Sequence, residues 1–393
     1  AYTNETQIMW NGVIGQLLLT ARQPQYVSQV QVYPAVKDKS VKASVVLKNA
    51  AQKAVAATVL VQVLDRQQKV IAAKKESLPL HPGERKHTLQ LSVPRAKEWD
   101  EFNPAVYTLK TTLLINGKQQ EVHSVSFGMR EVAGANGLLY INGRRLFLRG
   151  TLECNIFPLT GHPPMDRKGW LKVFTTARAY GLNHLRFHSW CPPKAAFEVA
   201  DSLGMYLQVE LPFWNKNAGK DTALNRFLAA EASRILTEYG NHPSFCFLSM
   251  GNELEGDFDW LSSMVNRLKT EDPRRLYTTT TFTFQRNHGR WPEPADQFFI
   301  TQYTKKGWVR GQGIFNTYPP DFKTDYTKAV DSIPAPIVTH EIGQYSVYPN
   351  MNEITKYTGV LDPLNFKAIQ QDLQRKNMLS LSPAFTAASG KFA

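Results

Sequence analysis

The chain has 393 residues, of which 42% are hydrophobic and 11% aromatic, so it can bury a large core and favours two domains over one. No apolar run approaches the roughly 18 residues that a membrane span requires, which excludes membrane insertion. The formal net charge is +13, but lysine and arginine are scattered, without a recognisable nucleic-acid module, so nucleic-acid binding is not expected. An acidic glycan as substrate and a merely basic, solvated surface are both compatible with this charge.

The termini and the cysteines carry little information. The opening stretch AYTNETQIMWNG lacks the basic region and the apolar core of a signal peptide. Because Ala1 is not an initiator methionine, this absence leaves the compartment open. Three cysteines, Cys154, Cys191 and Cys246, cannot all pair and show no Cys-x-x-Cys spacing, so we expect ordinary buried thiols.

The first half of the chain alternates apolar and polar residues. Its alternating segments are YVSQVQVYP, VKASVVLKN, ATVLVQVLD, HTLQLSV, VYTLKTTLLI and EVHSVSFGM, separated by polar stretches such as KDKS and HPGERK. Segments of period two at short, regular spacing are typical of an antiparallel sandwich. Asn116-Gly117 adds a hairpin turn, because these two residues tolerate the positive φ angles that such a turn needs. We therefore predict a β-sandwich over residues 26–133.

After a second Asn-Gly turn at Asn142-Gly143, short apolar strands alternate with longer amphipathic helices. The strand and helix pairs are RLFLRG with DRKGWLKVFTTARAYG, LNHLRFH with PPKAAFEVADSLG, MYLQVEL with NRFLAAEASRILTEYG, and SFCFLSMG with FDWLSSMVNRLKT. LYTTTT, QFFITQY and APIVTHE are three further strand candidates. This succession predicts a parallel sheet, which can close as a (β/α)₈ barrel or stay open as a doubly wound sheet.

The polar residues at the strand ends distinguish these two folds. In a barrel, the loops after the strands build the active site from many strand ends. A doubly wound nucleotide fold would carry a glycine-rich turn after its first strand, and RGTLECN has none. We therefore predict the barrel, with one mouth that gathers Glu153, His188, Glu210, Asn252, Glu253, Gln302, Tyr303, His340 and Glu341.

Glu253 and Glu341 end the fourth and the seventh predicted strands, which face each other across the rim. Two carboxylates that meet there suit a retaining glycosidase, in which one attacks the anomeric carbon and the other protonates the leaving oxygen. About 5 to 5.5 Å between the carboxyl groups predicts retention, and a wider gap predicts direct attack by water. The alternative is an ion pair with Arg186 or Arg149 that only fills the barrel.

Several motifs, in this order, resemble glycoside hydrolase family 2, the family of β-galactosidases, β-glucuronidases and β-mannosidases. FGMREV followed by LLYINGRRLFLRG is similar to the family's passage from its sandwich into its barrel. GLNHLRFHSWCPP resembles the second strand, NHPSFCFLSMGNE the acid/base segment, and PIVTHEIGQY the seventh strand with the nucleophile. The resemblance covers residues 10–350. It implies a multidomain chain, with an immunoglobulin-like β-sandwich followed by a (β/α)₈ TIM barrel.

The resemblance also implies roles for the residues that match. Glu253 would be the general acid/base and Glu341 the nucleophile of a retaining, exo-acting β-glycosidase that uses no cofactor and no metal. Asn252 would bind the sugar 2-hydroxyl, and the alternative is that it caps the following helix. Arg186 would place an opposite charge beside Glu341, and the alternative is a structural ion pair.

Other candidate substrate-binding residues lie at the second and third strand ends. His188 and Trp190 are predicted to line the sugar pocket. His184 and His188 share one face of a strand, but a metal site would need a third ligand at suitable spacing. Glu210 is a candidate for binding the sugar or for polar contacts inside the barrel.

The sixth strand contributes two aromatic candidates. Tyr303 would donate a hydrogen bond to the nucleophile, and Trp308 would offer a ring face to a sugar. Packing at the barrel rim is the alternative for both. Gln302 stands where the family often has asparagine, and Glu255, past the turn, is the nearest rival of Glu253 as the acid.

Both ends of the chain differ from the pattern expected for a complete enzyme of this family. After Glu341, EITKYTGVLDPLNFKAIQQDLQRKNML favours helix and SLSPAFTAASGKFA is too small and polar for a buried strand, so the eighth strand has no candidate. IMWNGVIGQLLLTARQP resembles the last strand of the family's amino-terminal jelly roll. We expect an internal fragment: residues 1–25 from a sugar-binding jelly roll and linker, 26–133 as the sandwich, and 134–393 as an incomplete TIM barrel.

A barrel without its eighth strand exposes two strand edges, so we expect poor activity unless another segment or chain supplies that strand. The alternatives to the glycosidase are a non-catalytic carbohydrate-binding barrel, an inactive fragment of a hydrolase, and a metal-dependent hydrolase. The expected partner is a carbohydrate substrate, and a homo-oligomer is compatible with the sequence. A periplasmic or secreted location fits a carbohydrate-degrading role, and the sugar itself is not specified.

Overall fold

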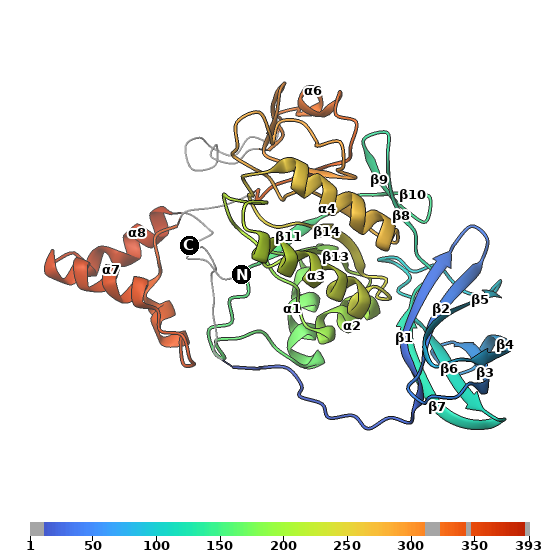
Figure 1. Cartoon of the computed structure of the whole chain (residues 1–393). Helices are drawn as coiled ribbons and strands as arrows, with labels where there is room; N and C mark the ends of the chain where they lie inside the picture. Colours follow the sequence, from blue (N-terminus) through green and yellow to red (C-terminus); the bar gives the residue numbers. More distant parts are fainter. Residues whose placement is uncertain (1–11, 311–322, 343–346, 390–393) are drawn as a thin grey trace.

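The computed structural model describes residues 12–310, 323–342 and 347–389 (Figure 1). Its first part is a β-sandwich of antiparallel strands, and its second part is a parallel sheet covered by helices. None of the described helices has both the length and the apolar character that crossing a bilayer demands.

The β-sandwich consists of two antiparallel sheets, as predicted. One sheet has the order β1 (Gln25–Ala35), β2 (Ser40–Asn49) and β5 (Gly83–Ser92), and the other has β4 (Val70–Leu80), β3 (Val55–Leu64), β6 (Tyr107–Ile115) and β7 (Lys118–Phe127). Alternate side chains of β3, namely Val59, Val61 and Val63, are fully buried between the sheets. The period-two pattern therefore places one face of each strand in a common core.

The turn prediction in the sandwich is confirmed, and one strand is missing from the predicted set. Asn116 and Gly117 adopt φ angles of 49° and 80° and join β6 to β7. The missed strand is β4, and β5 begins at Gly83, inside the stretch HPGERK expected as a loop. β4 lies at a sheet edge, where the charges of VIAAKKESLPL and its proline are tolerated because one side needs no ladder partner.

A small antiparallel sheet connects the two parts. It contains β8 (Val132–Ala135), β9 (Leu138–Ile141) and β10 (Arg144–Leu146), with Asn142 and Gly143 in the predicted turn between β9 and β10. RLFLRG therefore starts as a hairpin strand, and its assignment as the first barrel strand is wrong. The Asn-Gly turn folds this segment back onto β9, so the first barrel strand, β11, forms only at Gly150–Glu153.

Seven parallel strands follow one another around the barrel, in the predicted order. They are β11, β12 (His184–Phe187), β13 (Tyr206–Glu210), β14 (Phe245–Ser249), β15 (Leu276–Thr278), β16 (Phe299–Thr301) and β19 (Ile337–Thr339). The first five form one sheet, and within the described residues β16 pairs only with β19. Single bridges from Asn252 to Thr281 and from Thr281 to Ile300 join the two sheets.

Amphipathic helices cover the outside of this barrel (Figure 1). They are α1 (Arg167–Ala179), α2 (Lys194–Leu203), α3 (Thr222–Tyr239) and α4 (Phe258–Glu271), all four at predicted places, and the short α6 (Thr327–Val330). The minor strands β17 (Tyr303–Thr304) and β18 (Gly307–Trp308) form a hairpin. Arg130, just after the sandwich, donates to the carbonyl oxygens of Pro243 and Phe245, both at 2.9 Å, which fixes the sandwich to the amino-terminal end of β14.

The barrel is open between β19 and β11. No strand follows β19 in the described residues 347–389, which hold η1 (Met351–Lys356), α7 (Leu364–Arg375), η2 (Leu379–Leu381) and α8 (Ser382–Ala388). Helices α7 and α8 lie apart from the barrel (Figure 1). A cavity of about 680 Å³ lies at the opening, lined by residues of the β9–β10 hairpin, β11, β12 and β19. The prediction of a barrel without its eighth strand is therefore confirmed for the described residues.

The amino-terminal segment forms no strand over residues 12–24, and the start of the predicted jelly-roll strand lies outside the described residues. Leu17, Leu18 and Leu19 are exposed, by 84%, 80% and 104%. Their assignment to a jelly roll stays a prediction. The three thiols form no disulfide, and Cys246 is buried while Cys154 and Cys191 are half-buried.

Candidate active site

A strained turn at the end of β14 presents Glu253. Gly251 has a φ of 149°, and a side chain there would meet the carbonyl oxygen of Phe213 at 2.2 Å, so only glycine fits. Glu253 itself has a φ of 45°, and its amide donates to the carbonyl oxygen of Thr281 at 3.0 Å. A non-glycine residue held at positive φ is strained, and such strain concentrates at functional sites.

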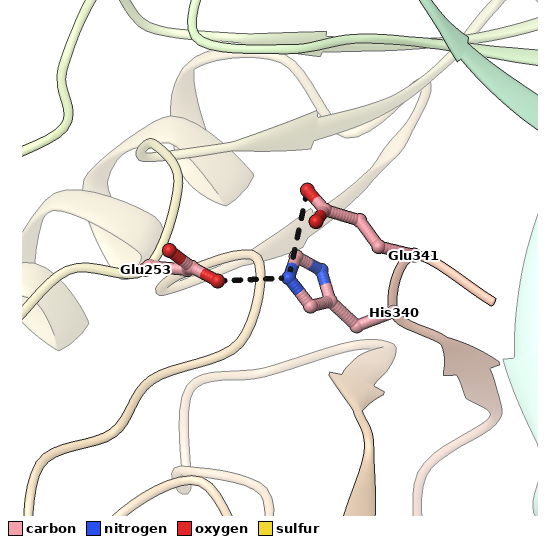
Figure 2. A group of neighbouring side chains, drawn as sticks. All are labelled: Glu253, His340 and Glu341. Atoms are coloured by element: carbon pink, nitrogen blue, oxygen red, sulfur yellow. Dashed lines mark hydrogen bonds and ion pairs between the residues drawn. The ribbon is translucent and has the colours of Figure 1, made fainter. Parts of the chain in front are cut away.

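Glu341 reaches the same place from the end of β19. Its φ is also 45°. The carboxylate oxygens of Glu253 and Glu341 and a ring nitrogen of His340 all lie within 4.8 Å of one another. Figure 2 shows the His340 ring between the two carboxylates, with its Nε2 3.2 Å from Glu253 Oε1 and 3.6 Å from Glu341 Oε1. The structure thus brings together the two acids that the sequence singled out.

Arg186 in β12 holds three predicted site residues together. Its Nε donates to Glu210 Oε1 at 2.7 Å, its Nη1 to Glu341 Oε1 at 2.9 Å and its Nη2 to Asn252 Oδ1 at 2.5 Å. Burial alone would raise the pKa of Glu210, but the adjacent guanidinium outweighs it and the pKa is lowered. Arg149 pairs instead with Glu101 at 2.7 Å, so of the two proposed arginines only Arg186 meets the acids.

Burial shifts the pKa values of Glu253 and His340 in opposite directions. Burial raises the pKa of Glu253, although His188 and Arg186 oppose this shift. Burial lowers the pKa of His340 to about 3, so its imidazole is neutral near pH 7 and its Nε2 can donate to one carboxylate at a time. The site therefore combines one carboxyl group that favours its proton with a second that faces a permanent cation.

Asn252 is not the cap of the following helix, so this alternative is wrong. The N-cap of α4 is Asp257, whose side chain accepts from the amide of Trp260 at 3.0 Å. Asn252 is 1% exposed, and within the described residues its buried Nδ2 has no partner at full hydrogen-bond geometry. It lies close enough to Glu253 to oppose the rise in the pKa of that carboxyl group, so this amide donor faces the proposed acid.

His188 and Trp190 lie on different sides of the β12 end. His188 is 8% exposed, and its Nε2 is 3.6 Å from Glu341 Oε1, so it faces the acids. The ring of Trp190 packs against those of Trp170 and Phe187, at centroid distances of 6.2 and 5.4 Å. The Trp190 ring therefore packs on the core, while its Nε1 donates to the carbonyl oxygen of Glu153 at 3.4 Å, and its contact with a sugar stays a prediction.

The aromatic residues after β16 pack edge to face, with each other and with Phe282. Tyr303 lies edge-on to Phe282 at 5.6 Å and to Trp308 at 5.4 Å. Trp308 is 52% exposed, so a ring face is open to solvent. A hydrogen bond from Tyr303 to Glu341 stays a prediction.

Three residues of the site were not assigned a role from the sequence. His340 directly precedes Glu341, and its place at a strand end was the available signal. Arg310 is 1% exposed and donates through Nη1 to the carbonyl oxygen of Glu341, and burial lowers its pKa to about 10. Trp214 lies 4.9 Å from the His188 ring. Both Arg310 and Trp214 stand in loops, where no periodicity points to a site.

Among the described residues, Glu253, His340 and Glu341 also form a group whose side chains are of the types that can bind a metal ion. His184, the other histidine considered as a ligand, turns away from them: its Nδ1 bonds to the carbonyl oxygen of Tyr206 at 2.9 Å, and its ring packs on Phe247. Arg186 already places a positive charge on Glu341, which opposes a second cation there.

Glu153 at the end of β11 gives a prediction about stability. Burial raises its pKa from 4.5 to about 7, so the folded state binds its proton more tightly than the unfolded state. The native fold is therefore destabilised by this carboxyl group at high pH. The loss of folding free energy is absent below pH 4.5, grows as the pH rises and is complete above pH 7. We expect Glu153→Gln to raise the free energy of unfolding by roughly 2 to 3 kcal/mol at pH 8 and to have little effect at pH 4.5.

Urea denaturation at both pH values measures this difference. The matched control is Glu84→Gln, at an exposed position of β5, which should give equal small effects at the two pH values. An effect of Glu153→Gln that does not grow with pH would contradict the prediction.

Comparisons with known proteins find relatives for both parts of the fold. The family model described as glycosyl hydrolases family 2 matches residues 25–130, and the model of its TIM barrel domain matches residues 132–357. A putative β-glucuronidase of Formosa agariphila is 27% identical over 188 residues, which are 48% of this chain and 22% of that protein. A β-galactosidase of Priestia megaterium is 22% identical over 282 residues, 67% of this chain and 26% of that protein.

Solved structures show the same fold. A glycosyl hydrolase family 2 member from Bacteroides cellulosilyticus has a TM-score of 0.62 at 21% identity, covering 72% of this chain and 38% of its own. The β-glucuronidase of Parabacteroides merdae has a TM-score of 0.55 at 19% identity, covering 65% and 33%. The chain thus spans about a quarter of the length of the curated relatives described above and about a third of these structures.

Proposed function

The chain belongs to glycosyl hydrolases family 2, and on this premise we propose that it carries the catalytic pair of a retaining, exo-acting β-glycosidase. The printed names of its relatives, β-glucuronidase and β-galactosidase, support a β-linked terminal sugar as substrate. Glu341 is the proposed nucleophile and Glu253 the proposed acid/base.

One observation carries this proposal: one carboxylate oxygen of Glu253 lies within 4.8 Å of one carboxylate oxygen of Glu341. Retaining glycosidases keep their two carboxyl groups about 5 to 5.5 Å apart, whereas inverting enzymes need about 6.5 to 9.5 Å to admit a water molecule. The short separation supports direct attack by one carboxylate on the sugar.

The proposed reaction has two steps. In the first, a Glu341 oxygen bonds to the anomeric carbon as the bond to the leaving oxygen breaks, and Glu253 transfers its proton to that oxygen. In the second, Glu253 takes a proton from water, the water oxygen bonds to the anomeric carbon, and Glu341 leaves as a carboxylate. The raised pKa of Glu253 suits the acid role, because a larger fraction of it is protonated near neutral pH.

Two neighbours support the proposed reaction. Arg186, 2.9 Å from Glu341 Oε1, offers a permanent positive charge to the carboxylate that must attack. Asn252 holds a buried Nδ2 that has no partner at full hydrogen-bond geometry among the described residues, and it would donate to the sugar hydroxyl next to the reacting carbon. That contact strengthens in an oxocarbenium-like transition state.

The test is covalent trapping. Incubation with 2-deoxy-2-fluoro glycosides that bear a good leaving group, in the glucuronide and galactoside series, should add one glycosyl mass to the chain. Peptide mapping should place this mass on Glu341. A label on another residue would contradict the assignment, and hydrolysis that inverts the anomeric centre would contradict retention.

The acid/base role of Glu253 gives a separate prediction. We expect Glu253→Gln to lower kcat/KM by roughly 10² to 10⁴-fold for substrates with poor leaving groups and far less for activated aryl glycosides, which need no proton. Rates on a series of aryl glycosides of increasing leaving-group pKa measure this. An equal loss on all members would contradict the role.

A second candidate is an inactive barrel. The opening between β19 and β11, with its cavity of about 680 Å³, favours this candidate because Glu341 stands at the end of an edge strand. In that case trapping with the fluoro glycosides fails for the chain, while carbohydrate binding measured by calorimetry persists.

A further inference from the structure

A second cavity, of about 1320 Å³, lies outside the strand ring beside β15 and β16. Residues 279–298 between these strands form no helix, so this part of the barrel wall is a loop. The loop and the β17–β18 hairpin contribute to the cavity wall the residues Phe284, Arg286, Arg290, Trp291, Tyr303 and Lys305. We call this cavity the loop groove.

The loop groove carries three cationic side chains and two acids, and the cations are not paired with those acids. Arg286, Arg290 and Lys305 are exposed, and within the described residues none of them has an ion pair. The Arg290 guanidinium lies over the Tyr303 ring at 5.0 Å, and the Lys305 ammonium lies over the Trp291 ring at 5.4 Å. These ring contacts position both cations and leave their N–H groups available.

The acids of the groove are already engaged. Glu293 Oε1 lies 2.7 Å from His288 Nδ1. The two oxygens of Asp296 accept from the amides of Thr279 and Glu293, at 2.7 and 2.9 Å. The three cations of the groove are therefore free to bind an external anion.

Aromatic side chains complete the groove. Phe284 is 59% exposed and Trp291 40% exposed, so their rings are open to a ligand. Aromatic faces next to cations suit a sugar chain that bears carboxylate or sulfate groups, because rings pack on the apolar face of a pyranose while guanidinium and ammonium groups bind the anions.

The loop groove adjoins the catalytic site through side chains that contact both. Gln285 Oε1 accepts from the amide of Gly256 at 2.5 Å, in the loop that carries Glu253. On the other side, Tyr303 contacts Phe282, whose ring stacks on His340 at 5.1 Å. Phe282, which is 1% exposed, therefore lies between Tyr303 in the groove wall and His340 of the catalytic site.

We propose that the loop groove is a binding subsite for the acidic part of the substrate, an oligosaccharide that carries carboxylate or sulfate groups beyond the bond that is cleaved. This inference rests on the proposed function, because it takes the groove as an extension of that site. The net charge of +13 agrees with an anionic ligand and also draws it to the protein.

The test measures binding to the full chain with the substitution Glu341→Gln, so that no turnover interferes. Calorimetry compares three oligosaccharides of equal length: a uronate-containing one, a sulfated one and a neutral one. With Arg286→Gln, Arg290→Gln and Lys305→Gln added, we expect the dissociation constant of at least one acidic oligosaccharide to rise at least about tenfold, with the neutral one nearly unchanged. The acidic oligosaccharide whose dissociation constant rises shows whether the groove binds carboxylate or sulfate groups.

The matched control removes three exposed cations elsewhere, with Lys168→Gln, Lys172→Gln and Lys220→Gln. It should leave acidic binding within about twofold, because general attraction is weak next to direct charge-assisted contacts. Unchanged acidic binding in the groove variant, or an equal loss in the control, would overturn the proposal. Failure of covalent trapping would overturn only the proposed function, because binding is read without turnover.

Discussion

Glu341→Gln is expected to lose on the order of 10⁴-fold or more in kcat, as removal of a nucleophile does in other covalent enzymes. Glutamine keeps the shape of the side chain, and its amide oxygen still accepts from Arg186, which lies 2.9 Å from Oε1 in the native site. It cannot form the ester with the sugar. The measurement is hydrolysis of an activated aryl glycoside, together with a thermal unfolding curve that should resemble that of the native chain.

Glu255→Gln is the matched control for this loss. Glu255 lies two positions past Glu253 and pairs with Lys216 at 3.6 Å, a contact whose lysine is 80% exposed. Its replacement should leave kcat within about threefold of the native value, since exposed ion pairs contribute little. If Glu341→Gln kept its activity while Glu255→Gln lost it, the assignment of the two catalytic acids would be wrong.

Arg186→Met is expected to lower the free energy of unfolding by about 3 to 5 kcal/mol, because it leaves a buried charge without its partner. The arginine side chain is 9% exposed and its partner Glu210 is fully buried. Glycosidase activity should also fall, since Asn252 and Glu341 lose the donor that they share. Urea denaturation at pH 7 gives the size of the effect.

The pH dependence of this loss identifies its cause. The pKa of Glu210 is lowered from 4.5, so its ionised form stabilises the native fold above pH 4.5, and this part is lost as the pH falls through the lowered pKa. The difference between Arg186→Met and the native chain should therefore shrink in acid. Arg167→Met, which breaks an exposed pair with Glu198 at 3.1 Å, should cost at most about 1 kcal/mol, and an equal loss in both variants would contradict the prediction.

Much of this architecture follows from periodicity. Strong alternation in segments such as ATVLVQVLD predicts the sandwich because both of its sheets bury one face. The four long helices were placed correctly because each has an apolar stripe. The edge strand β4 could not be found in this way, since its exposed positions carry charges that also suit a loop.

The site was predictable where strands end and not where loops converge. Glu253 and Glu341 stand directly after buried strands, so chain order alone places them at one rim. The contact of Arg310 with the Glu341 carbonyl depends on the path of the loop after β18. The placement of the two acids on either side of the His340 ring involves positive φ angles at Glu253 and Glu341, which cannot be predicted from residues other than glycine.

The two proposed catalytic acids belong to different sheets. Glu253 follows β14 in the five-stranded sheet, whereas Glu341 follows β19, which pairs with β16 alone in the part of the chain that the structure describes. Two single bridges through Thr281 form the seam between them. Separation of this seam would move the reacting groups apart while the larger sheet stays folded. Catalytic activity should therefore be lost at a lower temperature than the midpoint of thermal unfolding.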